Sequence, residues 1–285
     1  MKTLWIHTRP DGESAAKPLP LPYRHLDRPL DPNIFKRQAI GEDVGRPRIA
    51  KSLGLCAMHI RTNHRGSWEP AAARCLGFIL SGQVSFETGD EAVCTLGSSD
   101  VFFEDDCLSR GHRVKYEGDC RILKLLVDPS WEPRGTALPA LDNVSDGGAQ
   151  TVNIKRMYRA ADNKAYFRSF DELFPDDSGT FGPPRAVLGF HFVSFPDGAF
   201  IDWHPEGSNN LVLVSAGELE LEVSGDGSKE VFGPGSAVLA EDRVGEGHID
   251  RMRGLTRLAM IVFEDQHLWK VPFKNSPSQN NEIPT

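Results

Sequence analysis

The sequence predicts an all-β protein built from two tandem copies of one strand-rich domain. Two observations lead to this prediction: short apolar runs alternate with turn residues along most of the chain, and one half of the sequence repeats in the other. The one helix candidate is a short segment from Ser169 to Phe174, which Ser169 is placed to cap. Closely spaced short strands of this kind are typical of a β-sandwich or barrel.

The repeat is clearest around two tryptophans. The segment SWEPAAARCLGFILSGQVSFETGD in the first half aligns with DWHPEGSNNLVLVSAGELELEVSGD in the second. The matched pairs, 135 residues apart, are Trp68 with Trp203, Pro70 with Pro205, and Gly82 with Gly217. Further on the offset is 136 residues, and the pairs are Gly97 with Gly233, Asp106 with Asp242, and His112 with His248. One residue inserted in the SGDGSK turn accounts for the change, and the lead-in IHTRPDGES corresponds loosely to MYRAADNKA.

Each copy contains an alternating apolar stretch interrupted by glycine, GFILSGQVSFE in the first and NLVLVSAGELELEV in the second. The alternation predicts strands, and the Ser-Gly and Ala-Gly pairs predict a hairpin turn in the middle of each stretch. The segments AVLAED and RLAMIVFED predict further short buried strands. The Pro-rich tract Pro18 to Pro32, and the stretch from Asp176 to Pro184, predict surface connections or arms.

Composition narrows the classes of partner. The chain has 285 residues, 39% hydrophobic and 25% charged, which is ordinary for a soluble globular protein. Its net charge of −8 contains no long run of like charges, so we expect neither nucleic acid nor a membrane surface as a partner. There is no apolar run of membrane-spanning length and no signal-peptide core at the N-terminus, so we expect a cytoplasmic protein.

The five cysteines all lie in the first half and include no C-x-x-C pair. An odd number without such spacing argues against a disulfide framework and against a structural zinc site. We expect these cysteines to be small apolar groups, with a nucleophilic cysteine as the minor alternative.

The second copy carries a recognisable spacing: Gly198, five residues, His204-Pro205-Glu206, three residues, Asn210, six residues, Gly217. It resembles the first motif of the cupin superfamily, in which Gly, His-x-His, Glu and Gly follow at these intervals. Gly235 and His248 match the second motif, and GPGSAVLAEDRVGEGH is similar to the GPGDVLLVEDTTGKGH signature of a group of small cupin proteins.

The resemblance covers residues 153–265 well and residues 50–130 more weakly. It implies a bicupin, two tandem double-stranded β-helix (jelly-roll) barrels. The N-terminal domain would comprise residues 1–145 with the Pro-rich arm, and the C-terminal domain residues 146–285.

A metal site in the second barrel also follows from the resemblance. Typical cupins hold a divalent metal with three histidines and one glutamate; here His204 and His248 match two histidines, Glu206 replaces the third, and Asn210 replaces the glutamate. Two histidines and a carboxylate suit Fe(II), and Mn, Ni and Zn are compatible with the same set. His204 and Glu206, two residues apart, would face the same side of a strand. Alternatively, both histidines are hydrogen-bonded residues at the barrel mouth that serve an organic ligand or the structure.

The first copy has Glu69, Ala71, Cys75 and His112 at the ligand positions, so we expect no comparable metal cage there. That domain is expected to be structural or to contribute to a dimer. Since Asp106 and His112 persist in it, part of the role of the matching aspartate and histidine in the second copy is compatible with structure, for example an aspartate capping a turn.

Three side chains are candidate acid or base groups near the presumed site: Glu206, Asp202 and His191. Asp250 is a further candidate, as a base or as a partner that orients a histidine. The alternatives without a catalytic role are that His191 is a hydrogen-bonded core residue and that Asp202 and Asp250 are solvated at the surface. The recurrence of the two tryptophans favours packing over a substrate platform.

These features lead to two main hypotheses. The first is a metal-dependent enzyme of dioxygenase, isomerase or lyase type that acts on a small molecule in the second barrel. The second is a metal-free protein that binds or senses a small molecule. A seed-storage-like structural bicupin is a weaker third, and the absence of a helix-turn-helix segment disfavours a DNA-binding regulator. A homodimer and a pseudo-dimeric monomer are both open.

Overall fold

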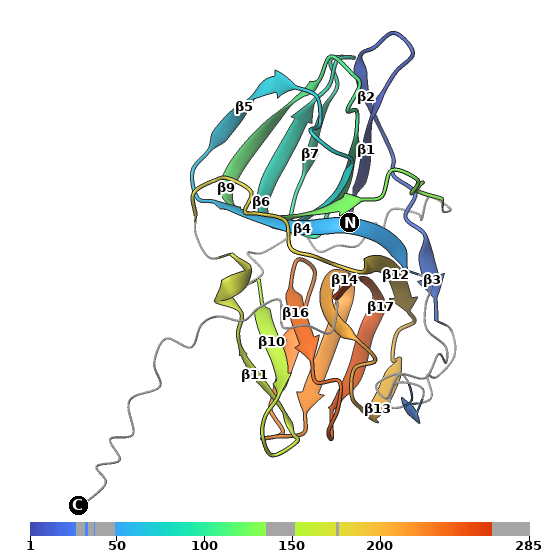
Figure 1. The fold of residues 1–285 in the computed structure, drawn as a ribbon, viewed down its shortest axis with the longest axis vertical. Coiled ribbons are helices and arrows are strands. Elements are labelled where there is room, and N and C mark those ends of the chain that lie inside the picture. The colour runs from blue at the N-terminus through green and yellow to red at the C-terminus, as the bar shows by residue number, and fades with distance from the viewer. Residues whose placement is uncertain (27–31, 34–36, 38–48, 135–151, 175–176, 264–285) are drawn as a thin grey trace, which may run out of the picture.

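The computed structural model describes residues 1–26, 32–33, 37, 49–134, 152–174 and 177–263, which form two β-barrels stacked along the long axis (Figure 1). The first barrel consists of β1 (Thr3–Thr8), β2 (Ser14–Lys17), β4 (Ala50–Ile60), β5 (His64–Glu69), β6 (Cys75–Glu87), β7 (Val93–Leu96), β8 (Val101–Asp105) and β9 (His112–Val127). The second consists of β10 (Ile154–Arg159), β11 (Ala165–Ser169), β12 (Gly189–Phe195), β13 (Phe200–His204), β14 (Asn209–Val223), β15 (Lys229–Phe232), β16 (Ala237–Glu241) and β17 (His248–Phe263). The predicted all-β, double jelly-roll fold is therefore confirmed.

Each barrel is closed by two long antiparallel strands that belong to both of its sheets. In the second barrel, the first part of β14 pairs with β16 and the last part with β15, while β17 pairs with it throughout. β6 has the same relation to β8, β7 and β9 in the first barrel. The pairing registers shift around Ser81 and Ala216, which marks a β-bulge where each strand bends from one sheet into the other.

The hairpin turns predicted in the middle of these two stretches are therefore wrong, because each stretch is one continuous strand. The glycine is required by the bulge instead. Gly82 and Gly217 have φ of 79° and 68°, a conformation that disfavours other residues. A Cβ on Gly217 would also lie 2.7 Å from the Cα of Thr256 on β17. A β-bulge and a hairpin turn both favour glycine because both require a positive φ, so the sequence alone did not distinguish them.

The strand pairings confirm the duplication and its offsets. Glu87 pairs with Val93, and the matching pair in the second barrel is Glu222 with Lys229, so the inserted residue lies in the β14–β15 turn as predicted. The lead-in segments also match: each is an antiparallel hairpin, β1–β2 or β10–β11, whose first strand pairs in parallel with β8 or β16 respectively.

The two barrels share one apolar core where a sheet of each packs against the other. Side chains of β6 such as Leu76 and Phe78 meet Leu211 and Leu213 of β14 in a single buried cluster that also contains Phe190 of β12. Two further clusters fill the interiors of the individual barrels. Successive residues on each central strand thus serve the shared core and the barrel interior alternately.

The N-terminal segment crosses from the first barrel to the second. β3 (Tyr23–His25) pairs in parallel with β12, and β4 of the first barrel also reaches β12 (Figure 1). The predicted Pro-rich arm therefore contributes, over its described part, to the second barrel of the same chain. The domain boundary predicted between residues 145 and 146 lies outside the described residues. The stretch near Arg185 follows β4, with Leu55 and Arg185 exchanging backbone hydrogen bonds.

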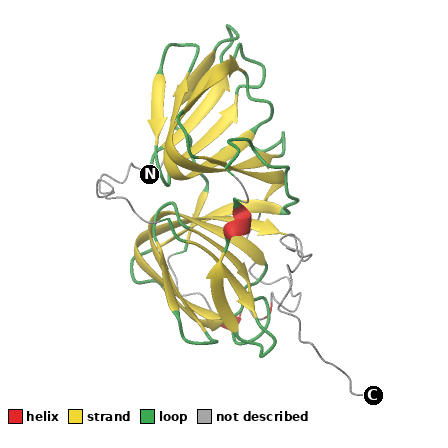
Figure 2. Cartoon of the chain, turned by 90° about the vertical axis from the view of Figure 1, so that its left-hand side faces the viewer, coloured by secondary structure: helices red, strands yellow, loops and turns green. Residues whose placement is uncertain are grey.

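The predicted helix is a single 3-10 turn, η1 (Asp171–Leu173), visible as the helical turn between the barrels in Figure 2. Phe170 rather than Ser169 occupies its N-cap position, and no side chain caps it, so the predicted cap is wrong. All five cysteines are free, Cys75 and Cys120 being buried. Among the described residues, the structure contains no helix with the length and apolarity needed to cross a membrane.

Candidate metal and ligand site

The second barrel encloses a cavity of about 190 Å³. Its wall is mostly apolar, and the polar side chains that reach it come from β3, β12, β13, β14, β17 and the β13–β14 loop. The apolar lining consists of Leu26, Val193, Phe195, Ile201, Val212, Leu219, Leu221, Val238, Ala240, Leu258 and Met260. The polar lining consists of Arg24, His191, His204, Glu206, Ser208, Asn210 and Asp250. A few polar groups converging in an apolar pocket are typical of a small-molecule site.

His204 is the last residue of β13 and is almost completely buried. Its Nδ1 lies 2.9 Å from the backbone carbonyl oxygen of Asp202, which fixes the orientation of the ring. The strand ends here because Pro205 has no N–H for a further ladder bond. Gly247 closes over this point, where a Cβ would lie 2.0 Å from the carbonyl oxygen of His204, so only glycine fits.

His248 begins β17 and pairs in register with His204. Its Nδ1 lies 2.7 Å from Oδ2 of Asp242, which is fully buried. Although burial alone lowers the pKa of His248, the carboxylates of Asp242 and Asp250 raise it well above the usual range. The predicted role of Asp242 as a turn cap is thus replaced by a buried carboxylate–imidazole pair.

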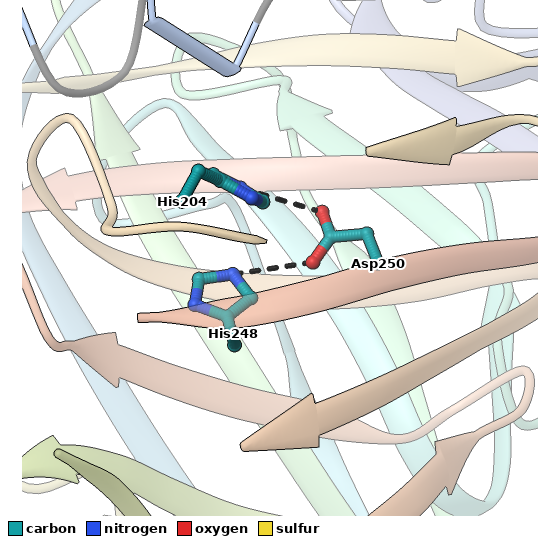
Figure 3. A group of neighbouring side chains, drawn as sticks. All are labelled: His204, His248 and Asp250. Carbon is teal, nitrogen blue, oxygen red and sulfur yellow. Dashed lines mark ion pairs between the residues drawn. The ribbon is translucent and has the colours of Figure 1, made fainter. Parts of the chain in front are cut away.

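The carboxylate of Asp250 lies beside the two imidazoles and faces both of them (Figure 3). Its Oδ1 is 3.1 Å from Nε2 of His248, and its Oδ2 is 3.9 Å from Nε2 of His204. The two rings are 4.4 Å apart between centroids. Oδ1 is buried without a well-aligned hydrogen-bond partner. Burial and the charge of His248 lower the pKa of His204, so that ring is neutral beside a charged one.

Glu206 lies beyond the end of β13 rather than on a continuous strand, yet its side chain is buried and lines the same cavity. One oxygen, Oε1, is 3.9 Å from Nε2 of His248, and the other accepts a hydrogen bond of 3.0 Å from Nδ2 of Asn210. Burial raises the pKa of Glu206 to about 8, so the carboxyl carries a proton at neutral pH. A buried carboxylic acid beside a charged imidazole is able to donate a proton.

Asn210 takes part mainly by holding Glu206. Its Oδ1 accepts a hydrogen bond from Oγ of Ser208 at 3.0 Å, while its Nδ2 donates to the glutamate. Its two polar ends are therefore engaged with neighbours. Among the His, Cys, Asp and Glu side chains of the described residues, His204, His248 and Asp250 form a group whose ligand atoms all lie within 4.8 Å of one another.

The two remaining candidate acid or base residues, His191 and Asp202, lie in different places. The side chain of His191, on β12, lines the cavity and its Nδ1 is buried without a hydrogen-bond partner. Asp202 is exposed; its carboxylate accepts a hydrogen bond from the backbone N–H of Trp203, outside the cavity. Trp203 and Trp68 are 37% and 38% exposed, so neither is a core residue and neither lines the cavity.

The residues present fit a divalent metal ion. Both histidines have Nδ1 engaged by an oxygen and direct Nε2 toward the carboxylate of Asp250, and a ring held through one nitrogen in this way is the usual arrangement of metal-ligating histidines. Asp250 supplies a carboxylate beside the two Nε2 atoms, and its Oδ1 has no well-aligned hydrogen bond. Two imidazoles and a carboxylate on one side leave positions for further ligands, and Glu206 is near enough to serve as a fourth.

The first barrel has the same buried histidine–aspartate pair but no open site. Nδ1 of His112 lies 2.8 Å from Asp106, while its Nε2 is 3.5 Å from Glu104. Nζ of Lys124 lies 2.7 Å from the same glutamate, and Cys75 donates to it as well. Strand pairing makes Glu104 and Lys124 the counterparts of Ala240 and Met260, so a closed ion pair stands where the second barrel has its cavity.

From the sequence, Asp250 was expected only as a base or as a partner that orients a histidine. The signal that would have raised it is its position two residues after His248 on the same strand, which puts both side chains on one face. In the first barrel the corresponding position is Val114, so the carboxylate is specific to the second copy.

Comparison with known proteins gives no match to a protein-family model and no match among curated proteins. Among solved structures, the chain is similar to a cupin 2 conserved barrel domain protein from Leptotrichia buccalis, with 12% identity and a TM-score of 0.36 over 79% of this chain and 99% of that one. It is also similar to a protein of unknown function of the DUF861 family from Pseudomonas syringae pv. tomato, with 14% identity and a TM-score of 0.36 over 92% and 100% of the two chains. An oxalate decarboxylase from Bacillus subtilis gives 13% identity and a TM-score of 0.26 over 74% and 69%. At these identities and TM-scores the comparisons carry no argument about this chain, so both the fold and the chemistry of the site rest on its own residues.

Proposed function

We propose that the second barrel is a metal-dependent active site for a small organic molecule, with His204, His248 and Asp250 as the metal ligands. The observation that carries the proposal is the shared geometry of the two histidines. Each ring is fixed through Nδ1, and each Nε2 is directed to one carboxylate inside a cavity large enough for a small ligand. A bound divalent ion would act as a Lewis acid toward a ligand oxygen.

The chain's own groups support proton transfer beside that ion. Glu206 is held by Asn210 and carries a proton at neutral pH, so it is placed to donate or recover one at the ligand. His191 offers an unpartnered ring nitrogen on another wall of the cavity. The mostly apolar lining lowers the local dielectric constant, which strengthens each electrostatic interaction inside. Isomerase, lyase and dioxygenase chemistry all use groups of these kinds.

One observation favours a second candidate function, a metal-free protein that binds or senses a small molecule. The carboxylate of Asp250 already faces both imidazoles, so the three side chains neutralise part of one another's charge without a metal. In that case the cavity alone would serve the ligand.

The test is titration of the full-length, chelator-treated protein with Mn(II), Zn(II) and anaerobic Fe(II), followed by calorimetry and by metal analysis after dialysis. The wild type is expected to retain close to one equivalent, and Asp250→Asn and His248→Ala are expected to lose at least about 100-fold in affinity. Asp242→Asn should lose about 10–100-fold, because it acts through the histidine. Asp202→Asn is the matched control and should bind as the wild type does.

Two results would exclude the metalloenzyme. One is the absence of metal retention by the wild type with all three ions. The other is an Asp250→Asn variant that binds metal as tightly as the control. Either result would leave the metal-free binding protein as the explanation of the cavity.

A further inference from the structure

The cavity has a cation that the metal site does not use. Arg24, on β3, is exposed to solvent and also lines the cavity, so it marks the mouth where the cavity meets solvent. Within the part of the chain that the structure describes, Arg24 has no ion-pair partner. An arginine without a carboxylate partner at the edge of a pocket is available to a ligand.

Strand pairing explains why this side chain faces the cavity. Arg24 lies in register with Val193 in the parallel pair β3–β12, so the two side chains point to the same face, and Val193 lines the cavity. The flanking residues face the other way: the hydroxyl of Tyr23 is 3.0 Å from Ser215, and Nδ1 of His25 is 2.8 Å from Ser194. These two anchored neighbours fix the strand and hence the arginine.

A second donor-or-acceptor group lies close to the same wall. His191 is two residues before Val193 on β12 and therefore on the same face, with its Nδ1 buried and without a hydrogen-bond partner. Burial, together with the positive charge of Arg24, lowers the pKa of His191 to about 4. The wall beside β3 thus presents a cation and a neutral imidazole, whereas the aliphatic side chains behind them offer no polar partner.

We infer that the ligand of this cavity is a small monocarboxylic acid whose apolar body lies inside the barrel and whose carboxylate pairs with Arg24. The inference rests on the proposed function of the cavity and names its substrate class. A guanidinium binds a carboxylate through two parallel hydrogen bonds, which gives orientation as well as affinity. A cavity of about 190 Å³ is below the usual range for drug-sized ligands, so the acid is short. Arg24 is then a specificity-determining residue that the N-terminal segment supplies to the second barrel.

The test compares hexanoate with its neutral analogue hexan-1-ol by isothermal titration of the full-length protein, as purified and after removal of metal. The wild type is expected to bind hexanoate at least about tenfold more tightly than the alcohol. Arg24→Gln should remove this preference by weakening hexanoate alone, and Arg24→Lys should restore part of it. Arg65→Gln, which removes an exposed arginine of the first barrel, should behave as the wild type. Ala240→Phe should abolish binding of both probes, since it fills the cavity.

The inference is overturned if Arg24→Gln keeps the preference for hexanoate, or if the wild type binds neither probe. Its failure is separable from failure of the metal site, because metal retention is measured on the same samples. Arg24→Gln should retain metal as the wild type does. A hexanoate preference that depends on Arg24 in a protein that retains no metal would uphold the ligand class and reject the metal. Retained metal together with a preference independent of Arg24 would do the reverse.

Discussion

Gly77 and Phe102 lie opposite each other in the first barrel, and their counterparts in the second barrel are Val212 and Val238. The Phe102 ring is buried over Gly77, such that a Cβ added to the glycine would lie 1.9 Å from the ring carbon Cζ. The first barrel thus has a phenylalanine facing a glycine at the position where the second barrel has two facing valines. We predict that exchanging the pair, but not either residue alone, is tolerated.

The magnitudes follow from this contact. Gly77→Val adds three carbons where the first already overlaps the ring, which should cost at least about 2–3 kcal/mol in the free energy of unfolding of the first barrel. Phe102→Val leaves a void and should cost about 2–4 kcal/mol, somewhat less than truncation to alanine. In the double variant the new valine at position 77 occupies part of that void. The double variant should therefore be more stable than the sum of the single costs by at least about 2 kcal/mol.

Hydrogen–deuterium exchange measured by mass spectrometry suits this prediction, because peptides from β6 and β8 report on the first barrel alone. Peptides from β14 and β16 of the second barrel provide the internal control and should change little. If the single costs add to within about 0.5 kcal/mol, the two positions are independent and the packing argument is refuted.

Two further predictions concern the same pair of barrels. Burial lowers the pKa of His112, but hydrogen bonds and charges from Asp106 and Glu104 outweigh burial and raise that pKa to about 9. The raised pKa stabilises the folded protein. This stabilisation is complete below the unfolded-state pKa of about 6.5 and is lost as the pH rises to 9. Urea unfolding should thus show a loss of up to about 3 kcal/mol between pH 6.5 and 9 that is absent in His112→Gln; equal losses in both proteins would contradict it. Ala240→Glu should destabilise the second barrel by several kcal/mol, since it buries a further carboxylate beside Asp250 and Asp242, whereas Ala240→Glu with Met260→Lys should recover much of the loss and close the cavity to hexanoate. A double variant no more stable than Ala240→Glu alone, by thermal unfolding, would show that the ion pair does not form.

The sequence was sufficient for the fold because the repeat reproduces residues with fixed geometric roles. Gly82 and Gly217 mark the bulges, and the histidine–aspartate pairs recur at the start of the last strand of each barrel. The hairpin interpretation failed because positive φ is common to bulges and turns. Local residue preferences identify such a backbone conformation but not the strand partners that decide between the two.

The candidate site was less accessible to sequence reasoning for a related reason. The cavity position of Glu206 was inferred from strand alternation, but the strand ends at His204 and a loop places the carboxyl there. Asp202 is two residues from a histidine and still faces solvent, since it lies within the register shift between Ile201 and His204 where β13 pairs with β17. Arg24 could not be anticipated at all, because only the crossing of β3 brings it to Val193.

The contrast between the barrels bears directly on what the second one binds. In the first barrel the carboxylates of Glu104 and Asp106 are matched by two cations, the buried His112 and the partly buried Lys124, so these charges balance. Burial raises the pKa of Glu104, but Lys124 and His112 together lower it to about 2, as expected for a carboxylate fully paired in this way.

The second barrel keeps the histidine–aspartate pair and replaces the lysine with methionine. Asp242 and Asp250 then face a single charged imidazole, while His204 and the carboxyl of Glu206 are neutral near pH 7. Two carboxylates and one charged imidazole leave a net negative charge inside a mostly apolar barrel, where an uncompensated charge is costly. A cation bound between the two histidines would restore the balance that Lys124 provides in the first barrel, which is the physical reason to expect metal at this place.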